Sequence, residues 1–258
     1  MAEVNTERDG AVLVVTLNRP DAMNAINRAV LDQFSGAWME AAEPDVRAVV
    51  ITGSGRGFCA GADLKGGGAG QDPATSGLRH TYNTHVLGLA ALDKPVIAAV
   101  NGAAAGAGLS LACAADIRIA SEAAKFVPAF ARIGLIPDAG GSYFIPRILG
   151  YSRAFEWLCT ARPLSAQEAL TWGLVSEVVA PDALMGRAME LAQQLAGMPG
   201  LALSLTKKLL VRSASAALAE QLEDEARAQP VAMTAPGRAE ARAAVVNAIS
   251  SAPPAAGS

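Results

Sequence analysis

Short apolar runs alternate with amphipathic stretches along the first half of the chain. The runs at 12–17, 46–52, 95–100 and 116–120 are rich in β-branched residues and end at Gly, Pro, Asn or Asp, which predicts buried strands. Between them, apolar residues recur at helical spacing over 30–41, with Asn27 as N-cap, and over 78–92, and an Ala-rich helix follows 101–102. Strands that alternate with helices indicate an α/β fold with a mostly parallel sheet.

Helical patterns dominate the second half of the chain. Apolar stripes over 184–195, 201–210 and 218–228 predict amphipathic helices. We therefore expect a core over 1–195, a helical region over 196–250 and a frayed tail over 251–258.

Composition and charge exclude several classes of protein. The 258 residues are 52% apolar and 17% charged, with a net charge of −3, which argues against disorder and against binding nucleic acid or an anionic membrane. The uncharged stretch 96–115 has the length of a membrane span, but Asn101 and Gly102 interrupt it, which favours a strand, a turn and a helix. The start of the chain has no basic and apolar leader, and no cysteine forms a C-x-x-C pair, so we expect a cytoplasmic protein.

Several known motifs are incomplete in this sequence. The glycines at 53, 55 and 57 follow a strand, but Phe58 stands where a dinucleotide-binding turn needs its third glycine. The nucleophile-elbow pattern that begins at Gly108 ends in Ala112. His80 and His85 are five residues apart, which puts them on different faces of a helix and makes them poor joint ligands. No metal site is predicted.

Two glycine-rich turns, at 53–64 and 101–108, each follow a buried strand and precede a helix or loop. Small residues let the backbone approach a ligand closely, and helix N-termini present free N–H groups. Two such groups that converge on one point would form an oxyanion hole. The alternative is a pair of tight turns that serve only close packing of helix on sheet.

Five segments together resemble the signature segments of the crotonase (enoyl-CoA hydratase/isomerase) superfamily. They are 18–26, 57–64, 101–108, 136–142 and 165–175. The resemblance implies a crotonase-type ββα spiral with a helical C-terminal trimerisation region, acyl-CoA thioesters as substrates, and no cofactor beyond the coenzyme A of the substrate. It also implies a homotrimer or a hexamer built as a dimer of trimers.

The resemblance also implies which residues contact the thioester. By position, the backbone N–H groups of Ala62 and Ala107 would hold the thioester oxygen and stabilise an enolate. The residues expected to contact the coenzyme A part are Ala22, Met23, Ala60, Asp63 and Leu64. Relatives often have a basic residue near 21–23, which this chain lacks; Arg19 and Arg56 are nearby cations that could instead be solvated surface charges.

The residues at the expected reaction centre favour an isomerase. Hydratases of this superfamily use two glutamates to activate water, and their positions here hold Ser110 and Phe130. Asp138 stands where double-bond isomerases, including ring-epoxide isomerases of phenylacetate breakdown, have an aspartate that moves a proton. An apolar setting formed by Phe130, Ile136 and Phe144 would raise its pKa. The alternative is that Asp138 only caps the next helix.

We therefore expect an enzyme that shifts a double bond in an enoyl-CoA, with Asp138 as the base. Two alternatives remain: a hydratase with a different water site, and an acyl-CoA binder without activity. Tyr82 and Asn83 would face the acyl pocket by resemblance, or else belong to the packing or the surface. The loop 65–77 is expected to shape the mouth of the pocket.

Overall fold

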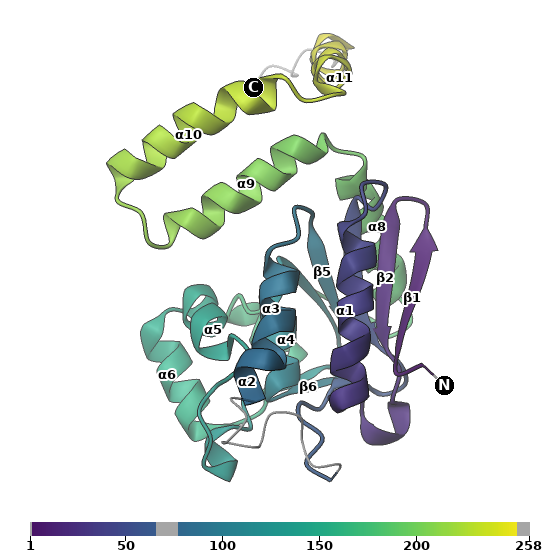
Figure 1. Cartoon of the computed structure of the whole chain (residues 1–258), viewed down its shortest axis with the longest axis vertical. Helices are drawn as coiled ribbons and strands as arrows, with labels where there is room; N and C mark the ends of the chain where they lie inside the picture. Colours follow the sequence, from purple (N-terminus) through teal and green to yellow (C-terminus); the bar gives the residue numbers. More distant parts are fainter. Residues whose placement is uncertain (1, 66–76, 252–258) are drawn as a thin grey trace, which may run out of the picture. The chain divides into compact units, whose positions relative to one another are not determined.

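A computed structural model describes residues 2–65 and 77–251. The chain falls into two compact units, Met1–Leu195 and Ala196–Ser258 (Figure 1). Most of the loop predicted to shape the pocket mouth, residues 66–76, lies outside the described residues, as does the predicted tail from residue 252 onward.

The larger sheet of the first unit is mostly parallel, as the sequence predicts. Its order is β1-β2-β3-β5-β7-β10, and only β1 runs antiparallel to its neighbour. Its strands are β1 (Val4–Asp9), β2 (Val12–Leu17), β3 (Ala48–Gly53), β5 (Val96–Val100), β7 (Ile117–Ser121) and β10 (Glu177–Val179). Every residue of β3 and β5 is buried, because the sheet is covered on both faces.

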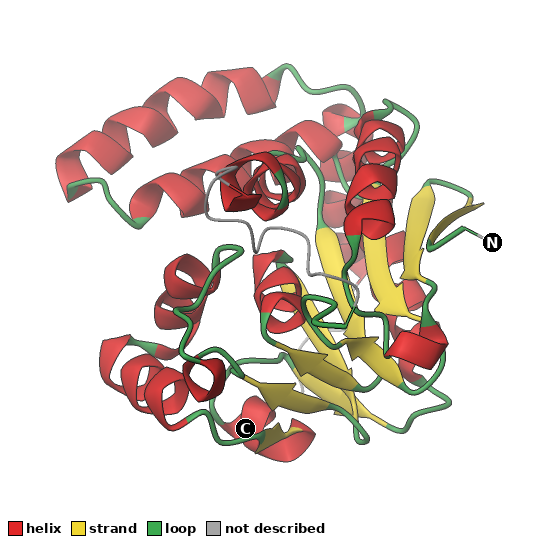
Figure 2. Cartoon of the chain, turned by 60° about the horizontal axis from the view of Figure 1, so that its bottom comes forward, coloured by secondary structure: helices red, strands yellow, loops and turns green. Residues whose placement is uncertain are grey.

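The apolar pattern does not predict a second, smaller sheet, two strands of which lie within the glycine-rich turns. Its order is β4-β6-β8-β9, and the strands of both sheets are drawn in yellow in Figure 2. The strands are β4 (Gly57–Cys59), β6 (Ala103–Ala105), β8 (Lys125–Val127) and β9 (Leu164–Ser165). The expectation of plain turns at 53–64 and 101–108 is therefore wrong in part, because each contains a short strand: Gly57–Cys59 in the first and the three alanines 103–105 in the second.

Eight helices are described in or at the end of the first unit. They are α1 (Arg28–Ala42), α2 (Gly77–His80), α3 (Tyr82–Ala90), α4 (Ala107–Ala114), α5 (Gly141–Leu149), α6 (Tyr151–Thr160), α7 (Ala166–Thr171) and α8 (Leu184–Ala196). Asn27 caps α1 as predicted, and its side chain accepts a hydrogen bond of 2.9 Å from the Val30 amide. The prediction of one continuous helix over 78–92 is wrong, because Thr81 interrupts the helical conformation between α2 and α3.

The second unit contains three helices, and few of their described residues are buried. These are α9 (Gly200–Ser213), α10 (Leu218–Met233) and α11 (Arg238–Ser251). No residue of α10 is buried. Among the described residues, no helix has the length and apolar character needed to cross a bilayer.

Candidate active site

The two glycine-rich turns are packed directly against each other. Strands β4 and β6 pair in parallel, with Gly57 opposite Ala103. A β-carbon at Gly108 would lie 2.2 Å from the carbonyl oxygen of Cys59, and one at Gly61 would lie 3.2 Å from the Ala107 nitrogen. Glycine is therefore required at these positions, and the segment that holds Ala62 is in contact with the start of α4.

Two asparagines fix the backbone of the first turn. The side-chain amides of Asn24 and Asn101 both donate to the Gly57 carbonyl, at 2.7 and 3.1 Å. Asn24 also donates to the Ser54 carbonyl at 2.9 Å and is fully buried. Both asparagines belong to segments that carry the resemblance, but the sequence alone assigns them no role. Asn101 directly precedes Gly102 of its turn, whereas Asn24 lies 33 residues before Gly57 and has no local signal.

The Ala62 amide belongs to a short extended segment that pairs with Ile26. The Ile26 amide donates to the Gly61 carbonyl at 2.7 Å, and the Asp63 amide donates to the Ile26 carbonyl at 3.0 Å. Successive peptide groups of an extended chain point in opposite directions. The N–H of Ala62 therefore points away from Ile26.

The Ala107 amide is at the N-terminus of α4. Its N-cap is Gly106, which has a φ of +50° and gives no side-chain cap. The first N–H groups of a helix have no partner within the helix and carry the positive end of its dipole. Two such amides on contacting segments can stabilise an anionic oxygen.

The five residues expected to contact coenzyme A lie on two segments that meet. The Ala60 amide donates to the Met23 carbonyl at 2.9 Å, which joins the segment of Ala22 and Met23 to that of Ala60, Asp63 and Leu64. Met23 has a φ of +51°, and its sulfur lies 3.1 Å from the Nε of Arg56. The Leu64 side chain is exposed. The structure therefore brings these five residues into one neighbourhood.

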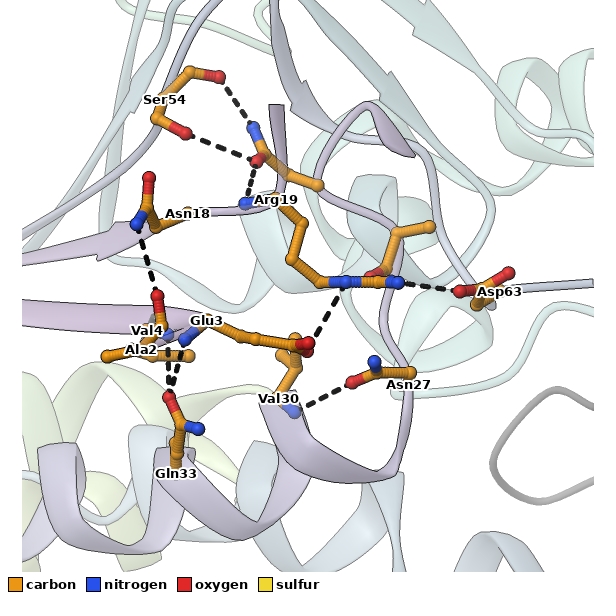
Figure 3. A network of polar contacts seen from close by, with 12 residues as sticks. Ala2, Glu3, Val4, Asn18, Arg19, Asn27, Val30, Gln33, Ser54 and Asp63 are labelled. Atoms are coloured by element: carbon orange, nitrogen blue, oxygen red, sulfur yellow. Dashed lines mark hydrogen bonds and ion pairs between the residues drawn. The ribbon is translucent and has the colours of Figure 1, made fainter. Parts of the chain in front are cut away.

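Arg19 is largely buried and paired with acidic side chains, so the alternative that it is a solvated surface charge is wrong. Its Nη1 donates to Asp63 Oδ2 at 2.9 Å and to the Ala25 carbonyl at 2.5 Å, and its Nε lies 3.3 Å from a Glu3 carboxylate oxygen (Figure 3). The Arg19 side chain is only 19% exposed and that of Asp63 only 14%. Two carboxylates therefore already balance the charge of Arg19.

Asp138 follows the short helical turn Ala131–Ile133 and precedes α5. Its Oδ1 is buried and has no hydrogen-bond partner among the described residues. Burial raises the pKa of its carboxyl to about 6, although its own backbone amide has the opposite effect. The capping alternative is wrong, because α5 begins at Gly141 with Gly140 as its N-cap and no side chain caps it.

Ser110 fixes the backbone of this aspartate. Its side chain is fully buried, and its Oγ donates to the Asp138 carbonyl at 2.8 Å. Ser110 is three residues after Ala107, so both lie on the same face of α4, separated by about 4.5 Å along the helix axis. The Asp138 backbone is therefore held against α4, the helix that begins with the Ala107 amide.

Of the three apolar residues predicted around Asp138, Phe144 is half-buried with its ring against Gly140, and Phe130 is buried with its ring near Gly106. Ile136 is 78% exposed, so its expected place in that setting is wrong. Val86 of α3 lies beside Gly140 instead, because a β-carbon there would be 3.2 Å from the Val86 Cγ1.

Tyr82 is a second polar group buried near Asp138. Its hydroxyl has no hydrogen-bond partner among the described residues. Burial raises its pKa, and the charge of Asp138 adds to that shift, so the hydroxyl stays protonated at neutral pH. Tyr82 and Val86 share a face of α3, which turns the tyrosine toward the Asp138 turn. Asn83 is exposed and points elsewhere.

Other reactive side chains do not form a site. Burial raises the pKa of the Cys59 thiol to about 12, which makes it a poor nucleophile. His80 is exposed, whereas His85 packs on Phe34 at 5.8 Å and burial lowers its pKa. In the described part of the chain no three His, Cys, Asp or Glu side chains gather closely enough to hold a metal ion.

Comparisons with known proteins agree with this architecture. The family model described as enoyl-CoA hydratase/isomerase matches residues 7–241. The chain is 41% identical over 220 residues to the 1,2-epoxyphenylacetyl-CoA isomerase of Escherichia coli K12, covering 83% of this chain and 84% of that protein. It is 35% identical to a 4-chlorobenzoyl coenzyme A dehalogenase of Arthrobacter, over 86% and 82% of the two chains.

A solved structure has the same fold. It is a protein from Mycobacterium abscessus assigned as an enoyl-CoA hydratase/isomerase, with a TM-score of 0.89, 39% identity, and coverage of 95% of this chain and 96% of that one. The two curated relatives have names for different reactions, so the choice of reaction depends on the residues of the site.

Proposed function

Because the chain belongs to the enoyl-CoA hydratase/isomerase family and has its crotonase-type α/β fold, we propose that it shifts a double bond in an enoyl-CoA by proton transfer. The observation that carries the proposal is the Asp138 carboxyl. Its Oδ1 is buried and has no hydrogen-bond partner among the described residues, and its pKa of about 6 suits a base that works near neutral pH.

The reaction uses one carboxylate and two amides. The Ala62 and Ala107 N–H groups bind the thioester oxygen, and Asp138 removes a proton from the α-carbon of a 3-enoyl-CoA. The electrons move onto the thioester oxygen to form a dienolate. The same proton then returns to the γ-carbon, which leaves a 2-enoyl-CoA and the ionised carboxylate. Removal of one oxyanion donor typically costs ~10²–10³ in rate.

Hydration has less support from the residues present. Ser110 has no carboxylate, and its hydroxyl is committed to the Asp138 carbonyl. Phe130 is buried, and a β-carbon at Gly106 would lie 4.0 Å from its ring. Addition of water needs a base for the water and an acid for the α-carbon, and these two positions supply neither.

The neighbourhood formed by Ala22, Met23, Ala60, Asp63 and Leu64 is the proposed contact for coenzyme A. Its two segments meet beside the Ala62 amide, and the exposed Leu64 provides apolar surface for the ligand. Arg19 is already paired, so phosphate contacts in this region would fall to Arg56, which is exposed.

We also propose the isomerase subgroup that includes ring-epoxide isomerases. The support is the Escherichia coli relative, whose name gives 1,2-epoxyphenylacetyl-CoA as its substrate, together with Asp138. A comparison of a ring-bearing acyl-CoA with a linear 3-enoyl-CoA of similar size would test this subgroup through their kcat/KM values.

The second unit is proposed to assemble a homotrimer or a hexamer. Helices α9 and α10 enclose a hollow of about 640 Å³ with an apolar lining, and large apolar side chains such as Leu218 and Leu222 are exposed. Exposed apolar surface of this kind marks interaction sites. Analytical ultracentrifugation of the wild type and of Leu222→Asp would test the assembly.

The reaction is tested by the conversion of 3-enoyl-CoA to 2-enoyl-CoA, followed as absorbance of the conjugated thioester. We expect Asp138→Asn to lower kcat by ~10² or more, the scale of general base catalysis, with little change in binding. Asp182→Asn, which changes an exposed aspartate, is the matched control. Hydration of 2-enoyl-CoA is measured with the same proteins.

Three results would contradict the proposal. Full activity in Asp138→Asn would remove the base. Hydration faster than isomerisation would favour a hydratase, whereas tight binding of acyl-CoA without either reaction would favour an inactive binder.

A further inference from the structure

Arg19 joins both sides of the pairing that orients the Ala62 amide. The isolated bridge between Ile26 and Ala62 has only two backbone hydrogen bonds. A single atom, Arg19 Nη1, donates to the carbonyl of Ala25 on one side and to the carboxylate of Asp63 on the other (Figure 3). The contacts of this atom therefore flank the bridge: one residue before Ile26 and one residue after Ala62.

The same residue also fixes the turn from which it extends. The Arg19 amide donates to the Asn24 side chain at 2.8 Å, and the Arg19 carbonyl accepts from the amides of Ala22 and Asn24 at 3.0 and 2.9 Å. Its Nε is paired with Glu3, next to β1. Arg19 is therefore held at both its backbone and its guanidinium.

The partial burial of this ion pair makes it more than a surface contact. Both side chains are at least four-fifths covered, so salt and water screen the interaction less than at an exposed pair. A planar guanidinium can donate in several directions at once, which a single ammonium group cannot do with the same geometry.

We infer that Arg19 is a positioning residue, which acts through Asp63 and the Ala25 carbonyl to aim the Ala62 N–H at the thioester oxygen. This inference rests on the proposed function, since the direction of that N–H matters only if it binds the oxygen. Arg19 itself does not touch the substrate.

The competing role for Arg19 is a direct contact with a phosphate of coenzyme A. The two roles differ in what they change. Loss of a phosphate contact weakens binding of every coenzyme A ester, whereas loss of positioning lowers kcat and leaves binding nearly unchanged. A misplacement of the order of 1 Å can cost ~10² in rate.

The test measures three quantities for the wild type, Arg19→Gln, Arg19→Lys and Asp63→Asn. They are the Kd of a 2,4-dienoyl-CoA, the red shift of its absorbance on binding, and kcat with a 3-enoyl-CoA. The red shift reports polarisation of the thioester carbonyl by hydrogen bonds, so a purely structural role would not change it. Arg28→Gln, which breaks the exposed Arg28–Asp32 pair at 2.8 Å, is the matched control.

We expect Arg19→Gln and Asp63→Asn to lower kcat by about tenfold and to reduce the red shift, and we expect Arg19→Gln to keep Kd within about threefold of wild type. The Arg19→Gln/Asp63→Asn double variant should lose no more than Arg19→Gln alone, because Arg19→Gln already removes the contact with Asp63. Arg19→Lys should be intermediate, and Arg28→Gln should match the wild type.

Three results would overturn the inference. A normal red shift and kcat in folded Arg19→Gln would leave Arg19 with a role in stability alone. A raised Kd with unchanged kcat would assign it to a phosphate. A wild-type protein that binds the dienoyl-CoA without any red shift would refute the proposed oxyanion site itself, which separates that failure from the first two.

Discussion

The backbone around Ala62 and Ala107 is held by many contacts, whereas the turn that holds Asp138 is held by few. Buried asparagine side chains, a strand pairing and glycine-to-backbone contacts fix the first region. At Asp138, the Ser110 hydroxyl and the Gly141 amide both donate to the carbonyl, each at 2.8 Å, and the preceding residues 131–136 are exposed.

This difference matches what each region has to supply. A backbone amide can donate a hydrogen bond whatever the side chain of its residue, so the direction of its N–H depends on the surrounding fold. A carboxylate acts as a base through its side chain, so the environment of that side chain matters more than the number of hydrogen bonds to its backbone. The predictions below test each half of this comparison.

The largest effect should come from crowding the first region. A β-carbon at Gly108 would overlap the Cys59 carbonyl oxygen, so Gly108→Ala should lower the free energy of unfolding by about 3 kcal/mol or more and abolish activity. Gly36→Ala in α1 is the control; nothing lies within 4 Å of its β-carbon, and the change should stabilise the helix by up to about 1 kcal/mol. Urea denaturation measures both. Equal stability of the two variants would contradict the packing described.

Asp138→Asn should stabilise the protein at alkaline pH while it lowers activity. The folded protein raises the pKa of this carboxyl from 3.8 to about 6, so the folded state binds its proton more tightly than the unfolded state. The stability contributed by the protonated Asp138 carboxyl is therefore lost as the pH rises from 3.8 through about 6. With allowance for partial exposure, the variant should gain roughly 1–2 kcal/mol at pH 8 and nothing at pH 3. Urea midpoints at both pH values provide the check, and a gain equal at both would exclude the ionised carboxylate as its cause.

Ser110→Ala should loosen the Asp138 turn. The lost hydrogen bond is worth roughly 1 kcal/mol, so kcat should fall by about fivefold to tenfold while KM changes little. Ser176→Ala is the control, because Ser176 also donates to a backbone carbonyl, that of Arg118, at 2.9 Å. Steady-state kinetics with a 3-enoyl-CoA distinguish the two, and an unchanged kcat in Ser110→Ala would show that the turn holds without the hydroxyl.

The smallest effect should come from a side-chain change at a backbone donor. Ala62→Ser keeps the N–H and the pairing with Ile26, so kcat/KM should stay within about threefold of wild type. The same kinetic assay measures it. A loss near that of Asp138→Asn would mean that the side chain at 62, and not its amide, faces the substrate.

The sequence predicts the four central strands of the larger sheet and the helices that match α1, α4, α8, α9 and α10, because runs such as 12–17 and 95–100 have a strong apolar signal. It does not predict β1 and β10, nor β4 and β6, which are three residues long and form through pairing between segments more than forty residues apart. Helix 78–92 is predicted as one element because its apolar spacing hides the break at Thr81.

In the candidate site, too, some features are predicted from the sequence and others are not. The resemblance assigns Ala62, Ala107 and Asp138, and the fold brings their segments together. The ion pair of Arg19 with Asp63, the hydroxyl of Ser110 on the Asp138 carbonyl, and the exposure of Ile136 depend on contacts between distant segments. Residue type and spacing contain no direct record of such contacts.

The carbonyl of Gly57 has a consequence for the order of events during synthesis of the chain. It accepts amides from Asn24 and Asn101, which lie 33 residues before it and 44 residues after it. A ribosome-bound chain that ends before residue 101 can form β2 and β3 but cannot complete this junction. Ligand-binding competence should therefore not appear before residue 101 has left the ribosome, so that shorter nascent chains would not sequester acyl-CoA.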